Sequence, residues 1–90
     1  MRCIRTFELR PNGSHKSFYK KAFVEEWDNG DKRLFSYGTQ VCIITGEGDV
    51  IRTWRGWSAT TQRHVNAFLS LYGLSAICGK ANWLKMSVSR

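Results

Sequence analysis

The chain has 90 residues, with 14 Lys or Arg against 7 Asp or Glu, and a formal net charge of +7. We expect a single domain over residues 1–90, because a chain of this length buries only one small core and has little room for a deep substrate cleft. The positive charge excludes an acidic mimic of nucleic acid and favours an acidic partner.

The first half of the chain is rich in β-forming residues separated by turn signals. These residues predict strands over Arg2–Leu9, Ser17–Trp27, Arg33–Tyr37, Gln40–Thr45 and Val50–Trp54. Asn29-Gly30 predicts a hairpin in which both turn residues take positive φ, Gly38-Thr39 a short connection, and Gly46–Asp49 a second hairpin. Such short connections do not allow parallel crossovers, so we expect an antiparallel meander of four to five strands.

The pattern changes to a helical period after Trp57. Val65, Phe68, Leu69 and Tyr72 form one apolar stripe, which predicts an amphipathic helix over about residues 58–72. The hydroxyl residues from Ser58 to Thr61 offer N-caps, and Gly73 suits a left-handed end. Lys80–Met86 predicts a short C-terminal helix. The fold class is therefore α+β, and we expect the long helix to cover the sheet face that carries Val41 and Ile43.

Charge is distributed unevenly along the chain. The balance is +5 over residues 1–24, −4 over residues 25–50 and +6 over residues 51–90, where no acidic residue follows Asp49. The acidic residues gather at the two predicted hairpin turns. We therefore expect a polarised molecule with an acidic end and a broad basic surface, although charged turns are also simply typical of solvated loops.

The candidates for catalysis are few. His64 follows Thr60 by one helical turn, but nucleophilic catalysis also needs a group that orients the imidazole. We expect instead that Thr60 caps the helix and that His64 packs at the edge of the helix–sheet seam, so the domain is not an enzyme. The three cysteines and two histidines show no metal-ligand spacing, which predicts free thiols, no metal and no cofactor.

The strongest local signal for binding is Trp54-Arg55-Gly56-Trp57, at the junction between sheet and helix. Tryptophan and arginine can stack on bases or form protein–protein hot spots, while one tryptophan could instead close the core and Gly56 permit the turn. We expect one tryptophan to be buried and the other partly exposed. The candidate residues for binding a partner or nucleic acid are Lys20, Lys21, Arg52, Trp54, Arg55, Trp57, Arg63, Lys80 and Lys85.

Three segments carry a family resemblance: Ser14–Ala22, Leu34–Val41 and Trp57–Leu69. Between about Ser14 and Met86 the chain resembles a family of small domains of unknown function from phages and prophages of low-GC Gram-positive bacteria. The most specific part is the block W-S-A-T-T-x-R-H-V-N-x-F-L. The resemblance implies a phage origin rather than a mechanism.

Small phage domains without catalytic residues often act by binding. We therefore expect a non-enzymatic inhibitor of a host nucleic-acid machine, similar to anti-CRISPR proteins, with a host protein or ribonucleoprotein such as an RNA-guided nuclease as partner. The alternative is an accessory protein that binds DNA or RNA directly. No run of residues is long and apolar enough for a membrane span and no signal-peptide core is present, so we expect the cytoplasm of the host cell and no membrane partner. An open edge strand or an exposed tryptophan would also suit a homodimer.

Overall fold

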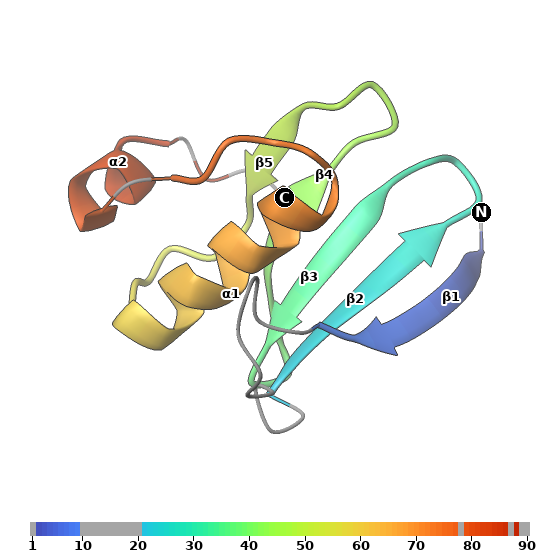
Figure 1. The fold of residues 1–90 in the computed structure, drawn as a ribbon, viewed down its shortest axis with the longest axis horizontal. Coiled ribbons are helices and arrows are strands. Elements are labelled where there is room, and N and C mark those ends of the chain that lie inside the picture. Colours follow the sequence, from blue (N-terminus) through green and yellow to red (C-terminus); the bar gives the residue numbers. More distant parts are fainter. Residues whose placement is uncertain (1, 10–20, 78, 87, 89–90) are drawn as a thin grey trace.

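The computed structural model describes residues 2–9, 21–77, 79–86 and 88, and confirms the α+β meander (Figure 1). Five strands form one antiparallel sheet in the order β1-β2-β3-β4-β5: Cys3–Glu8, Ala22–Trp27, Lys32–Ser36, Thr39–Ile44 and Val50–Arg52. Two helices follow, α1 (Ala59–Leu71) and α2 (Gly79–Lys85). Residues 17–20 of the predicted second strand lie outside the described residues.

The turns differ in one respect from expectation. The predicted hairpin at Asn29-Gly30 joins β2 and β3, and Gly30 has φ +93°, but the positive φ predicted for Asn29 is absent. Hydrogen bonds from the Gly30 N–H to the Trp27 carbonyl and from the Trp27 N–H to the Asp31 carbonyl enclose a three-residue loop. A three-residue loop needs positive φ only at its last residue.

Positive φ at two consecutive residues occurs instead between β3 and β4. Tyr37 has φ +52° and Gly38 has φ +79°, and Ser36 pairs with Thr39 across the turn. This is the two-residue hairpin of type I′, in which Asn-Gly is the preferred sequence. Only a short connection was predicted here, because tyrosine is a poor turn signal.

The two acidic turns lie together at one end of the sheet (Figure 1). The Gly46 N–H donates to the Asp31 carboxylate at 3.2 Å, and a Cβ on Gly46 would come within 2.8 Å of the Asn29 carbonyl oxygen. The end of a meander that carries the β2–β3 turn also carries the β4–β5 turn. The acidic end of the predicted polarised molecule therefore follows from the topology.

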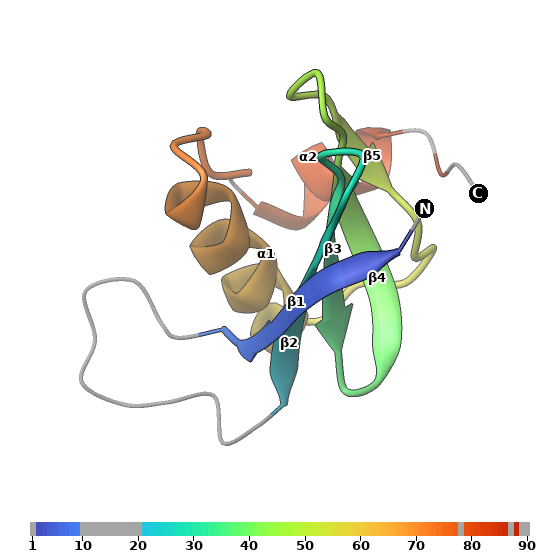
Figure 2. The ribbon, with the colours of Figure 1, turned by 90° about the vertical axis from the view of Figure 1, so that its right-hand side faces the viewer.

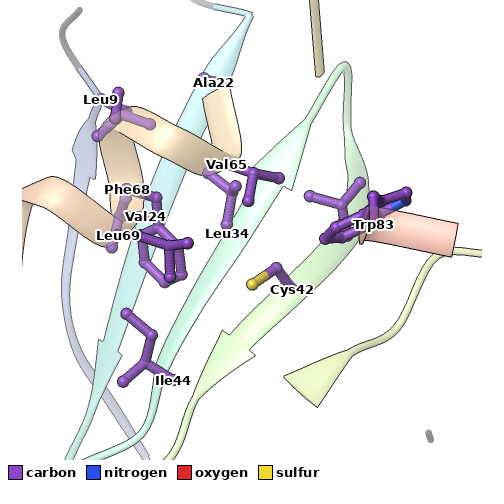
Figure 3. Close-up of a cluster of buried hydrophobic side chains, with 12 residues drawn as sticks. Leu9, Ala22, Val24, Leu34, Cys42, Ile44, Val65, Phe68, Leu69 and Trp83 are labelled. Carbon is purple, nitrogen blue, oxygen red and sulfur yellow. The ribbon is translucent and has the colours of Figure 1, made fainter. Parts of the chain in front are cut away.

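Helix α1 packs against one face of the sheet, and no described helix covers the other face (Figure 2). The register pairs Leu34 with Cys42 and Val24 with Leu34, which places Cys42 and Ile44 toward α1 (Figure 3). Ile43 pairs with Arg33 and Ile51 on the opposite face, so its predicted direction was wrong. Val41 nevertheless joins the core cluster, because a register shift in the β3–β4 pair leaves it opposite no residue.

The ends of α1 match the sequence signals. Ser58 is the N-cap, and its hydroxyl accepts from the Thr61 N–H at 3.1 Å. The prediction that Thr60 caps the helix was therefore wrong, because α1 begins at Ala59 and Thr60 is an exposed residue within it. At the other end, the Leu74 N–H donates to the Leu69 carbonyl and the Gly73 N–H to the Ser70 carbonyl. With φ +74° at Gly73, this is a Schellman motif.

The core lies between α1 and the sheet and is closed at one side by α2 (Figure 3). The predicted stripe of α1 provides buried Val65, Phe68 and Leu69. Tyr72 packs beside them, and its hydroxyl donates to the Glu26 carboxylate at 2.6 Å. None of the described helices has the length and apolar character that crossing a membrane requires.

Candidate binding surface

Arg52 lies inside the protein rather than on its surface. Its side chain is 4% exposed, and its guanidinium donates to the backbone carbonyls of Trp54, Arg55, Trp83 and Met86. It also lies over the Trp83 ring, 5.1 Å from the centroid. Arg52 therefore joins β5 to the segment 53–58 and to the end of α2.

This placement removes Arg52 from the predicted binding residues. The carbonyls in the last turn of a helix have no partner within the helix, and here Arg52 supplies one to Trp83. The Trp83 side chain also binds the segment 53–58, because its indole N–H donates to the Gly56 carbonyl at 2.8 Å. We call Arg52 and Trp83 the Arg52–Trp83 cluster.

Trp54 and Trp57 are both partly buried, so the predicted contrast between them is absent. The Trp54 ring lies against Gly56, where an added Cβ would come within 2.6 Å of the ring atom Cζ2. Glycine is thus needed at position 56 because the Trp54 ring lies so close to it. Gly56 does not have the positive φ of a left-handed turn, so the turn itself does not require glycine. Trp54 packs against the core cluster.

Trp57 is held at the point where the segment 53–58, α1 and α2 meet. Its indole N–H donates to the side-chain oxygen of Gln62 at 2.8 Å, and Gln62 in turn donates to the Ile77 carbonyl at 2.9 Å. The Lys80 ammonium group lies 5.5 Å from the centroid of the Trp57 ring. Gln62 was not among the predicted residues, because nothing in the sequence shows that residue 62 faces residue 57.

The exposed cations Arg55, Arg63 and Lys80 come from the same three elements. Together with Trp57 they form what we call the Trp57 surface. No acidic residue occurs after Asp49, so none of these elements supplies a carboxylate to neutralise it. The surface can therefore present positive charge beside an indole ring, a combination that suits phosphate groups and bases.

The remaining predicted residues lie elsewhere. Lys85 is exposed in the last turn of α2. Lys21 is exposed beside the β3–β4 turn, with its ammonium group 5.6 Å from the centroid of the Tyr37 ring. Lys20 lies outside the described residues.

A buried polar group joins α1 to β3. The Ser36 hydroxyl lies 2.8 Å from Nδ1 of His64 and 3.1 Å from the Thr61 hydroxyl, and all three side chains are buried. His64 thus packs at the helix–sheet seam as predicted, but its hydroxyl neighbours are Ser36 and Thr61 rather than Thr60. A serine so deeply buried cannot meet a substrate without a change in the fold.

Among the described residues, the thiols and possible metal ligands form no second site. Cys42 is buried in β4, and burial raises the pKa of its thiol to about 12, which makes it a poor nucleophile. Cys3 is also a free thiol, whereas Cys78 lies outside the described residues. Within the described part of the chain no three His, Cys, Asp or Glu side chains come together in a way that could hold a metal ion.

His64 predicts a specific dependence of stability on pH. Burial and the nearby Lys21 charge lower the pKa of His64 from its usual 6.5. The unfolded chain therefore binds the proton more readily, and stability should be highest above pH 6.5 and fall as the pH drops below it. Urea unfolding between pH 8 and pH 5 measures this loss, which His64→Gln should reduce while lowering stability at pH 7 by about 1–3 kcal/mol. An equal loss of stability in the wild type and in His64→Gln would contradict the assignment of the pH dependence to His64, because the carboxyl groups that both proteins share would then account for it.

The fold and surface define a class: a small α+β domain whose five-stranded meander is covered on one face by a helix and which presents a basic, aromatic surface. The comparison with family models identifies it further, since the model of a family of unknown function (DUF8033) matches residues 7–85. The chain belongs to this family. The match confirms the predicted resemblance to domains of unknown function and extends it toward the N-terminus, into β1. The searches of curated proteins and of solved structures found no match.

Proposed function

We propose that this domain is a non-enzymatic binding protein that inhibits a nucleic-acid machine of its host, docking on it through the Trp57 surface. The observation that carries the proposal is the Lys80 ammonium group 5.5 Å from the centroid of the Trp57 ring, with Arg55 and Arg63 exposed on the adjoining segment 53–58 and α1. The phage origin implied by the sequence resemblance supports a host target and a site of action in the bacterial cytoplasm. An anti-CRISPR-like role, with an RNA-guided nuclease as target, is the specific form.

Charge reversal on the Trp57 surface tests this proposal. Arg63→Glu/Lys80→Glu should reduce capture of the target from host lysate at least about tenfold, because like charges across an interface cost several kcal/mol. Arg2→Glu is the control, since Arg2 is exposed at the acidic end, where its carbonyl accepts from the Asp28 N–H. The captured complex should contain a nuclease or another enzyme of nucleic-acid metabolism, and the domain should inhibit that enzyme in a purified assay. The proposal would be refuted if Arg63→Glu/Lys80→Glu captured the target as well as Arg2→Glu does, or if the lysate yielded free nucleic acid alone.

Direct binding of DNA or RNA by an accessory protein of a phage or mobile element is the second candidate. The pairing of a cation with an indole ring at Trp57 favours it as well. Such binding should weaken steeply with salt, with a slope of about −0.9 in log affinity against log salt for each contacted phosphate of a duplex. A gel-shift titration without binding at low salt would remove this candidate.

A further inference from the structure

Tyr37 occupies a backbone position that tyrosine disfavours. Its φ of +52° is the only positive value of a non-glycine residue among residues 2–9, 21–77, 79–86 and 88. Such a conformation is unfavourable for a residue other than glycine, asparagine or aspartate, because the Cβ atom crowds the backbone. Asparagine would suit this type I′ turn better, so the turn itself does not explain the tyrosine.

The ring of Tyr37 is also largely open to solvent. The residue is 55% exposed, with the Lys21 ammonium group 5.6 Å from its centroid and the His64 ring 5.8 Å away. The ring therefore contributes little to the core, while its contact with His64 holds it beside α1. An exposed ring beside a lysine repeats the arrangement of Trp57 and Lys80.

Helix α1 connects the two arrangements. Gln62 binds Trp57, His64 contacts Tyr37, and the exposed Arg63 stands between them in the sequence. Successive residues of a helix are about 100° apart around its axis, so Gln62 and His64 lie on either side of the exposed Arg63 on α1. Two ring–lysine pairs, Trp57 with Lys80 and Tyr37 with Lys21, are thus contacted by residues on either side of Arg63, and we call these five residues the aromatic–cation track.

We propose that this track binds single-stranded nucleic acid, with Tyr37 as a stacking residue and Lys21 and Arg63 as phosphate contacts. The inference rests on the proposed binding role of the Trp57 surface and names the ligand that it takes. Bases in a duplex already stack on each other, whereas the faces of unpaired bases are free for aromatic side chains. Lys21 has an exposed and flexible side chain, which can move from the ring to a phosphate when a base takes its place.

The test uses two Tyr37 variants and fluorescently labelled oligothymidylate and oligouridylate of about ten nucleotides, a typical site size for such surfaces. Tyr37→Asn should keep or raise stability, because Asn-Gly is preferred in this turn, yet weaken binding at least about fivefold through the lost stacking. Tyr37→Phe retains the ring and should bind like the wild type. A duplex of the same length should bind more weakly than either single strand.

Each other outcome overturns the inference. If Tyr37→Asn binds as tightly as the wild type while Arg63→Glu/Lys80→Glu loses binding, the Trp57 surface remains but Tyr37 is no part of it. If the wild type binds no single strand at low salt but still captures and inhibits its host target, the ligand assignment fails and the proposed function stands. Tighter binding of the duplex would also contradict the stacking role. Unfolding by urea must show that both Tyr37 variants are folded, which the turn geometry predicts for Tyr37→Asn.

Discussion

Replacing Arg52 with methionine should lower the free energy of unfolding by about 3 kcal/mol. The loss of an arginine on the surface of a basic protein would be expected to change stability little. The Arg52 guanidinium donates to four backbone carbonyls, two in the segment 53–58 that follows β5 and two at the end of α2. Methionine fills a similar volume but donates nothing, so the carbonyls of Trp54, Arg55 and Met86 lose the guanidinium donor, and the Trp83 carbonyl keeps only the Met86 N–H. Urea unfolding followed by tryptophan fluorescence measures the effect.

Arg55→Met is the matched control for this prediction. Arg55 lies three residues later and is exposed, so its loss should change stability by no more than about 0.5 kcal/mol. Arg52→Lys should be intermediate, because a single ammonium group cannot reproduce the planar fork of donors. Equal stability of Arg52→Met and Arg55→Met would show that Arg52 is not the buried link that its contacts indicate.

Trp83→Ala should destabilise the domain by about 3–5 kcal/mol, the usual cost of removing a large buried aromatic side chain. Trp83 is 1% exposed and is part of the core cluster, where it lies beside Cys42 (Figure 3). Its removal leaves a cavity and deprives the Gly56 carbonyl of its donor. Because Lys80 lies on the same short helix, the Trp57 surface should also lose its order.

Leu84→Ala provides the control within α2. Leu84 follows Trp83 directly and is 46% exposed, and alanine is a better helix former than leucine, so this change should cost less than about 1 kcal/mol. Thermal unfolding of the two variants separates the packing of Trp83 from the helical propensity of α2. A similar loss in both would mean that α2 contributes through its own helix formation rather than through the buried indole.

The sequence predicted most accurately those features that depend on residues close together in the chain. Hydrophobic periodicity predicted α1, because the stripe from Val65 to Tyr72 has one face to bury, and Ser58 and Gly73 mark its ends. The short connections predicted the antiparallel meander, since they leave no room for a crossover. The meeting of acidic turns follows from the same topology, so it too could be anticipated.

The candidate surface could be predicted only in part. Arg55, Trp57, Arg63 and Lys80 were proposed from charge and composition, because cations close to tryptophan and the absence of acidic residues after Asp49 are visible in the sequence. Gln62 and Tyr37 were missed, since their roles depend on contacts across 5 and 27 residues, to Trp57 and to His64. Tyr37-Gly38 carried a weak signal, because a glycine between two strands allows a two-residue turn.

What the sequence by itself determined is the order of strands and helices and the uneven charge, both of which depend on neighbouring residues. Only the tertiary structure decided which side of β4 meets α1. All four residues from Val41 to Ile44 are apolar, so the register with β3 determines which of their side chains face the helix. The register of β4 with β5 then places Arg52 opposite Cys42 and therefore inside. A charged side chain is tolerated there because carbonyls of the following segment and of the distant end of α2 surround it, and no local pattern shows that the end of α2 comes to this place.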